Sequence, residues 1–170
     1  MEILWSPWRS EYIKTFKDKK ENEEPECFLC SAANDPFEMD ESNLIIYRGE
    51  ACYMILNKFP YNNGHLLITP YRHTGNLFSL GEDEYSELGM LVKKAVKIIE
   101  SAYKPHGFNI GINLGQAAGA GLPGHLHYHV IPRWNGDTSF TATASGTKVI
   151  SVSLEETYDQ LKAELNKTGN

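Results

Sequence analysis

Three histidines stand at alternate positions of residues 125–131, whose sequence is HLHYHVI. Strict alternation of this kind predicts a β-strand, because successive side chains of a strand point to opposite faces of its sheet. His125, His127 and His129 would then line one face at intervals of about 7 Å, with the apolar residues between them buried on the other. Imidazole acts as a nucleophile, a proton carrier and a metal ligand near neutral pH, so this face is a candidate functional site.

Three interpretations of the histidine face are open. It could be solvated, although solvated faces usually carry Lys, Glu or Thr. It could bind a metal through all three imidazoles, because a His-x-His pair in a strand can chelate zinc, or it could be catalytic. The preceding loop, residues 115–124, is rich in glycine. Glycine lets backbone N–H groups approach an anion closely, which favours catalysis on a phosphate, although a flexible hairpin connection would have the same composition.

Composition limits the class of protein. A chain of 170 residues with 41% hydrophobic and 22% charged residues has the size and composition of one globular domain. Its net charge of −6 argues against a general nucleic-acid or membrane-surface partner. The sequence shows no apolar run of membrane-spanning length and no secretory signal. Three cysteines, two of them spaced as Cys27 and Cys30, suit a reducing cytoplasm better than a disulfide framework.

The remaining patterns predict an α+β fold with an antiparallel sheet of about five strands. The expected strands are residues 44–47, 52–56, 65–69, 108–114 and 125–131. A Ser-x-x-Glu capping box at 79–82 begins a long central amphipathic helix that ends before Pro105, and a second box at 153–156 begins a C-terminal helix. Residues 5–16 are expected as a short helix and the highly charged residues 17–26 as a linker. We expect one domain over residues 1–170.

Residues 125–131 resemble the motif of the histidine triad family, His-φ-His-φ-His-φ-φ with φ apolar. The resemblance covers most of the chain. Residues 57–65, NKFPYNNGH, look like the nucleoside-contacting segment before the family's third strand. Residues 5–9, WSPWR, and 132–137, PRWNGD, look like a bacterial branch close to the fragile histidine triad hydrolases and the diadenosine tetraphosphate phosphorylases. The resemblance implies the histidine triad (HIT) form of the α+β fold.

The resemblance also implies roles for single residues. His127 would be the nucleophile on the α-phosphorus, giving a nucleotidyl-histidine, and His129 would contact the reacting phosphate. Asn57 would hold the ribose hydroxyls, and Ile55 would lie against the base. The other residues implied in the nucleotide and phosphate pocket are His65, Asn113, Gly119 and Gly121. Many relatives have Ser or Thr where this chain has Gly121, so backbone N–H groups would have to make that phosphate contact here.

Cys27 and Cys30 have the spacing of half a zinc site, although a redox pair or two unlinked thiols would look the same. The resemblance supplies the missing ligands, because relatives with this pair usually add the histidine of a Pro-x-x-His segment and the first triad histidine. Here these are His73 and His125. Four ligands make a closed structural site, so the zinc would orient the strand of His127 and take no part in the chemistry.

The leading hypothesis is an enzyme that cleaves dinucleoside polyphosphates, such as diadenosine tetraphosphate, through a nucleotidyl-histidine. The branch resemblance favours a phosphorylase that uses inorganic phosphate, and water as acceptor would make the protein a hydrolase. A nucleotide-binding or sensing protein with low turnover is disfavoured, because a binder needs no nucleophile. A catalytic metal on all three histidines is disfavoured by the cysteine pair, which offers a better use for His125. The family forms homodimers, and the apolar stripe that begins with Tyr85, Leu88 and Val92 is the candidate interface.

Overall fold

The computed structural model describes residues 27–138 and 149–167. Residues 27–135 and 150–167 form one compact unit, which contains every helix and strand named below. The helix expected for residues 5–16 and the linker expected for residues 17–26 lie outside the described residues, and a single domain over residues 1–170 stays a prediction. No helix in the described part of the chain is long and apolar enough to cross a membrane.

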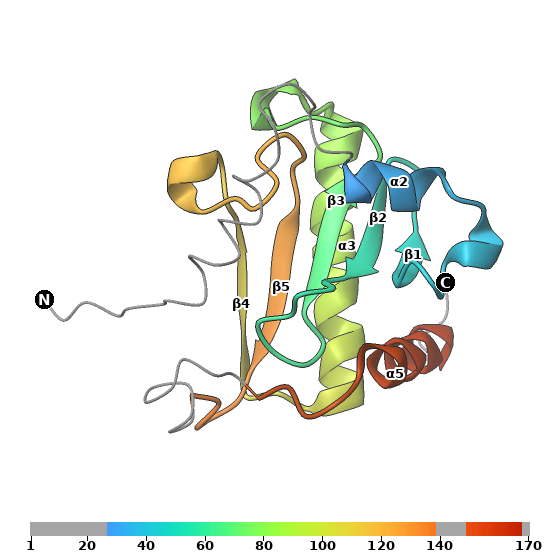
Figure 1. Cartoon of the computed structure of the whole chain (residues 1–170), viewed down its shortest axis with the longest axis vertical. Coiled ribbons are helices and arrows are strands. Elements are labelled where there is room, and N and C mark those ends of the chain that lie inside the picture. Colours follow the sequence, from blue (N-terminus) through green and yellow to red (C-terminus); the bar gives the residue numbers. More distant parts are fainter. Residues whose placement is uncertain (1–26, 139–148, 168–170) are drawn as a thin grey trace, which may run out of the picture. The chain divides into compact units, whose positions relative to one another are not determined.

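Five antiparallel strands form one sheet in the order β1-β2-β3-β5-β4 (Figure 1). The strands are β1 (Ile45–Arg48), β2 (Cys52–Leu56), β3 (Leu66–Pro70), β4 (Gly107–Ile112) and β5 (Tyr128–Arg133). The predicted α+β fold with an antiparallel sheet is therefore confirmed. Because β5 lies between β3 and β4, the strand that carries the last triad histidine has a hydrogen-bonded neighbour on each side.

The long central helix, α3 (Glu82–Tyr103), begins two residues later than the predicted capping box implies. Its N-cap is Gly81, whose N–H donates to the Glu84 carboxylate at 2.8 Å, whereas Ser79 ends the short 3-10 helix η2 (Leu77–Ser79). The second box is confirmed, because Ser153 Oγ accepts a hydrogen bond from Glu156 N–H at 3.1 Å. The other helices are α5 (Leu154–Lys167), α2 (Phe28–Asn34), η1 (Phe37–Met39) and η3 (Gln116–Ala118).

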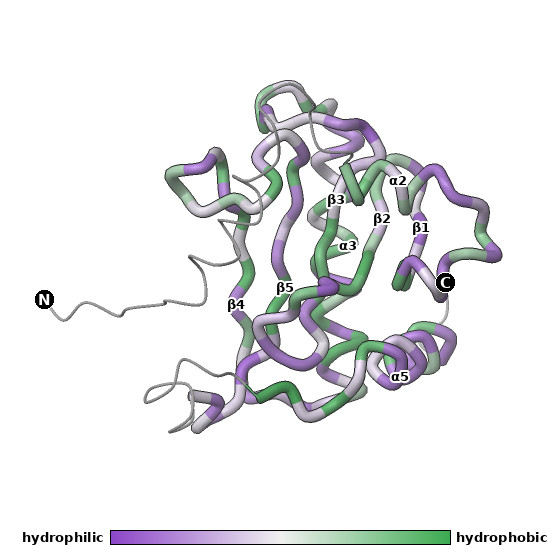
Figure 2. The backbone as a smooth tube through the Cα atoms, in the orientation of Figure 1, coloured by the Kyte–Doolittle hydropathy of each residue, from purple (hydrophilic) through white to green (hydrophobic). Residues whose placement is uncertain are grey.

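The two faces of the sheet bury different partners. On one face Met54 packs with buried residues of α3 and α5. On the other face Tyr53 and Ile55 pack with Leu29 of α2. Neighbouring residues of β2 thus alternate between two apolar clusters, and all five residues of this strand are buried. Hydrophobic colour dominates β2 and β3, whereas β5 has hydrophilic positions (Figure 2).

Candidate functional site

The histidine run is not one continuous strand. β5 begins at Tyr128, so His125 and His127 precede the sheet, and the expectation that three imidazoles share one strand face is wrong. The reason is local. Leu126 N–H donates to Thr74 O at 2.7 Å, and Leu126 O accepts from the Thr69 hydroxyl at 2.8 Å. At Leu126 these contacts take the place of hydrogen bonds to a neighbouring strand. His125 therefore faces a different set of side chains from His127 and His129.

His127 has a fixed orientation that leaves one ring nitrogen available. Its Nδ1 lies 2.8 Å from the backbone oxygen of His125. A carbonyl oxygen can only accept, so Nδ1 carries the proton and Nε2 keeps its lone pair. Burial lowers the pKa of His127, and this hydrogen bond opposes the shift. The neutral imidazole with a free Nε2 is the form that a nucleophile requires.

His65 is fixed by donors on one side. The N–H of Tyr61 donates to His65 Nδ1 at 3.1 Å. The Asn57 amide lies 3.3 Å from the same nitrogen, and it points its nitrogen there because its oxygen accepts from Phe59 N–H. His65 Nδ1 is therefore an acceptor, and the ring proton is on Nε2. Burial, together with the charges of His129 and His127, lowers the pKa of His65 to about 3, so this ring stays neutral.

The hydrogen bond from His65 determines which nitrogen of His129 carries a proton. His65 Nε2 lies 2.9 Å from His129 Nδ1, so His65 donates and His129 accepts, and the neutral His129 must carry its proton on Nε2. Asn113 Nδ2 lies 3.5 Å from this Nε2, and because an N–H there needs an acceptor, the Nε2–H assignment requires the Asn113 amide to turn its oxygen to this nitrogen. The ring centroids of His127 and His129 are 5.0 Å apart, and the Tyr61 ring stacks on His129 at 5.9 Å. A lone pair and an N–H donor thus stand side by side.

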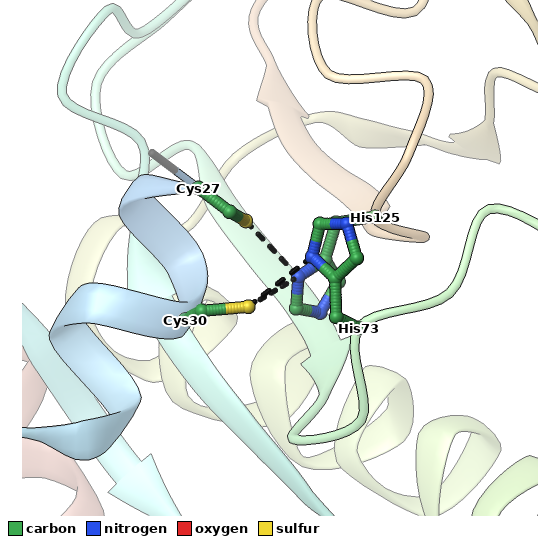
Figure 3. A group of neighbouring side chains, drawn as sticks. All are labelled: Cys27, Cys30, His73 and His125. Atoms are coloured by element: carbon green, nitrogen blue, oxygen red, sulfur yellow. Dashed lines mark hydrogen bonds between the residues drawn. The ribbon is translucent and has the colours of Figure 1, made fainter. Parts of the chain in front are cut away.

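A second cluster joins two thiols and two imidazoles (Figure 3). The possible ligand atoms of Cys27, Cys30, His73 and His125 all lie within 4.8 Å of one another. Cys27 Sγ is 3.2 Å from His125 Nδ1, and Cys30 Sγ is 3.2 Å from His73 Nδ1. Tetrahedral zinc with Zn–S and Zn–N bonds of ordinary length would separate its ligand atoms by about 3.5 Å, so the donor set fits that ion.

In this cluster His125 turns an unprotonated nitrogen, the form that binds a metal, toward the sulfur atoms. His125 Nε2 lies 2.9 Å from Pro70 O, so Nε2 carries the proton and Nδ1 faces the sulfur atoms with its lone pair. Burial and the neighbouring Cys27 raise the pKa of Cys30 to about 11, so in the absence of a cation this thiol keeps its proton. A bound cation favours the thiolate, and the described cysteines are free of disulfides.

No sequence pattern indicates the residues that hold α2. Tyr53 and Arg48 donate hydrogen bonds to its backbone oxygens, and contacts to carbonyl groups leave no pattern in a sequence. Tyr61 belongs to the expected nucleoside segment, yet its ring contact with His129 had no signal either. The structure brings together His65, His127, His129, Asn57 and Asn113 at one place and the four possible metal ligands at another.

Three expected contacts stay predictions. Ile55 is 3% exposed and packs in the α2-side core, and its contact with a base is untested. Gly119 N–H donates to Gln116 O at 2.9 Å, so this donor is already used inside the turn. A phosphate contact from the loop then depends on other backbone groups, such as that of Gly121.

The fold and the site define a class of α+β proteins in which a run of alternating histidines leads into a central strand. The HIT domain family matches residues 38–136, and the chain belongs to the histidine triad family. It is 38% identical over 164 residues to the AP-4-A phosphorylase of Mycobacterium tuberculosis, an alignment that covers 96% of this chain and 84% of the relative.

The chain is also similar to a tetraphosphatase over about half of its length and to a solved structure over most of its length. An asymmetrical bis(5'-nucleosyl)-tetraphosphatase of Schizosaccharomyces pombe is 35% identical over 95 residues, which are 56% of this chain and 52% of that protein. A zinc-bound histidine triad family protein from Mycobacterium smegmatis superposes with a TM-score of 0.66 at 27% identity. That superposition covers 84% of this chain and 95% of the solved one.

Proposed function

We propose that this protein cleaves dinucleoside polyphosphates through a nucleotidyl-histidine on His127, with inorganic phosphate as the favoured acceptor. The proposal rests on one observation, the buried His127 whose Nδ1–H is bound to His125 O at 2.8 Å and whose Nε2 is free. The similarity to the AP-4-A phosphorylase of Mycobacterium tuberculosis over 96% of the chain supports this substrate class.

The chemistry proceeds in two steps. His127 Nε2 attacks the α-phosphorus of diadenosine tetraphosphate, the bond from that phosphorus to the bridging oxygen breaks, and ATP leaves. His129 donates its Nε2–H to the phosphate oxygens, where charge develops. A phosphate oxygen then attacks the adenylyl group on His127 and displaces the imidazole, which yields ADP. Splitting one difficult displacement into two is the usual benefit of a covalent intermediate.

Water in place of phosphate would give AMP and ATP through the same intermediate. The relative from Schizosaccharomyces pombe named as a tetraphosphatase keeps this alternative open. The decisive experiment is product identity with diadenosine tetraphosphate at increasing phosphate concentration. ADP and ATP in the presence of phosphate support the phosphorylase, AMP and ATP at every concentration reject it in favour of the hydrolase, and absence of turnover rejects both.

We also propose that Cys27, Cys30, His73 and His125 bind one structural zinc ion per chain. With four protein ligands such a site has no open position for substrate. The zinc-bound relative from Mycobacterium smegmatis supports zinc as the metal, and the three unlinked cysteines fit a reducing, cytoplasmic setting. Metal analysis of gently purified protein tests the proposal, and a metal content near zero contradicts it.

The homodimer remains a further proposal, with a narrower interface than the sequence implied. Leu88 is 2% exposed and belongs to the core of its own chain, so it cannot serve as an interface residue. Tyr85 and Met90 of α3 are 55% and 67% exposed, and Ile110 of the edge strand β4 is 49% exposed. These residues are the revised candidates. A monomer mass by light scattering at micromolar concentration would reject the dimer.

A further inference from the structure

Helix α2 depends on the rest of the protein for its position. It has seven residues, with Cys27 as its N-cap and Cys30 in its first turns. A helix this short is not stable in water by itself, and its apolar anchor is Leu29, which is fully buried. The geometry of both thiols therefore depends on whatever holds this helix against the sheet.

Arg48 of β1 holds the C-terminal end of α2. Its guanidinium donates to backbone oxygens of Ala32 at 3.2 Å, Ala33 at 2.7 Å and Asp35 at 3.1 Å. The end of a helix leaves such carbonyl groups without partners inside the helix and favours a cation beside them. Arg48 Nε also donates to Asp40 at 2.8 Å, and the two side chains are only 10% and 15% exposed. These contacts are largely shielded from water and bind the helix end to the sheet.

Tyr53 of β2 holds the first turn of the same helix. Its hydroxyl donates to Leu29 O at 2.6 Å in a buried position. Its ring stacks on Tyr71, with centroids 5.2 Å apart and an angle of 24° between the planes. Tyr71 follows β3 and lies two residues before His73. The stacked pair therefore links Tyr53, which binds α2, to the segment that carries the ligand His73.

We propose that Arg48 and Tyr53 are positioning residues that hold α2, and with it both thiols, in metal-binding geometry. The four ligand atoms lie within 4.8 Å of one another, and the helix that carries both thiols is held by side chains of β1 and β2. In zinc fingers the fold forms only with the metal. Here α2 is also held by Arg48, Tyr53 and the buried Leu29, so the sheet should stay folded when zinc is removed. This inference rests on the proposed zinc site.

The first test is zinc affinity, measured by competition with a chromophoric chelator on the full chain. Arg48→Ala should bind zinc about 10–100-fold more weakly, as expected when a group that orients metal ligands is lost. Tyr53→Phe loses one hydrogen bond and should weaken binding by about 3–10-fold. Lys167→Ala is the control, because Lys167 is an exposed cation paired with Glu164 on α5, a helix that carries none of the four ligands, and it should bind zinc as the wild type does.

Cobalt supplies a spectroscopic readout of ligand geometry. Wild-type protein loaded with Co²⁺ should show the thiolate-to-cobalt absorption of a tetrahedral site, and Arg48→Ala should show it only at higher cobalt concentration. Arg48→Lys keeps the charge but lacks the planar fork that reaches several carbonyl groups, so it should restore part of the affinity. Wild-type zinc and cobalt affinity in Arg48→Ala would overturn the inference.

Hydrogen exchange of the zinc-free protein separates this inference from the zinc site itself. In zinc-free wild type the backbone N–H groups of α2 should remain protected, and in zinc-free Tyr53→Phe their protection should fall while the strands stay protected. Exchange of α2 at the rate of an unfolded segment in zinc-free wild type would overturn the role of Arg48 and Tyr53 in holding this helix. If the wild type binds no zinc at all, the proposed metal site fails, and the role of Arg48 and Tyr53 toward a metal fails with it.

Discussion

His125 and His127 are two residues apart, and they face opposite kinds of surroundings. His125 points to two thiols and a second imidazole, whereas His127 lies beside His129. In His125 the Nε2–H is bound to Pro70 O and Nδ1 is available; in His127 the Nδ1–H is bound to His125 O and Nε2 is available. A backbone carbonyl therefore decides which nitrogen of each ring is free, which suits the proposed metal binding at one end and the proposed nucleophilic attack at the other.

The largest expected effect is a loss of turnover at His127 that leaves the cluster around His125 unchanged. His127→Ala should reduce turnover of diadenosine tetraphosphate by about four orders of magnitude or more, because loss of a nucleophile removes the covalent path. Its zinc content should not change. The measurement is kcat together with metal analysis, and His106→Ala, which replaces an exposed loop histidine, is the control. Near-normal turnover of His127→Ala would show that the histidine pair is not the reacting centre.

The sequence predicted the strands better than the local turn that divides the histidines. Alternation located the strand but placed its start at His125, because it cannot report that the Thr69 hydroxyl and the Thr74 carbonyl bind Leu126 from outside the sheet. The family resemblance supplied the cluster of four possible ligands. Neither alternation nor resemblance could supply Arg48 and Tyr53, which act on carbonyl groups, nor α2, whose seven residues are too few for a clear apolar period.

A second prediction tests the direction of the hydrogen bonds at the histidine pair. His65→Leu removes the donor to His129 Nδ1, so the proton of His129 is no longer confined to Nε2. Loss of one aligned donor at a reacting oxygen typically lowers kcat by about 10²–10³-fold. His65→Gln keeps an N–H donor and should recover part of that loss. Long-range ¹⁵N–¹H correlation spectra should show the Nε2–H form of His129 in wild type, and an Nδ1–H form there would contradict the assignment.

At the cysteine end the expected loss concerns stability and metal. Cys27→Ala should abolish stoichiometric zinc binding. At free zinc about 100-fold above the dissociation constant, bound metal contributes about 2.7 kcal/mol, which corresponds to a Tm lower by about 5–10 °C in a domain of this size. The comparison variant is Cys52→Ala, because Cys52 is a buried thiol outside the cluster. Zinc retained by Cys27→Ala, or lost by Cys52→Ala, would contradict the ligand assignment.

The remaining prediction is a pH dependence of the free energy of unfolding that belongs to the histidine pair. Burial holds the pKa of His65 at about 3, below its ordinary value of 6.5. Below pH 6.5 the unfolded chain therefore binds a proton at this residue that the folded chain does not. The contribution of His65 is intact above pH 6.5 and is lost as the pH falls toward 3, at up to about 1.4 kcal/mol per pH unit.

This slope is measured by chemical denaturation between pH 7 and pH 4 on zinc-free protein, so that acid release of metal from His73 and His125 does not contribute. His65→Gln has no titrating group at that position, and its free energy of unfolding should fall less steeply with acid even if its value at pH 7 is lower. Equal slopes in wild type and His65→Gln would mean that His65 takes up its proton while folded. A charged His65 carries protons on both nitrogens, so its Nδ1 could no longer accept from Tyr61 N–H, the bond that places the proton of neutral His65 on Nε2.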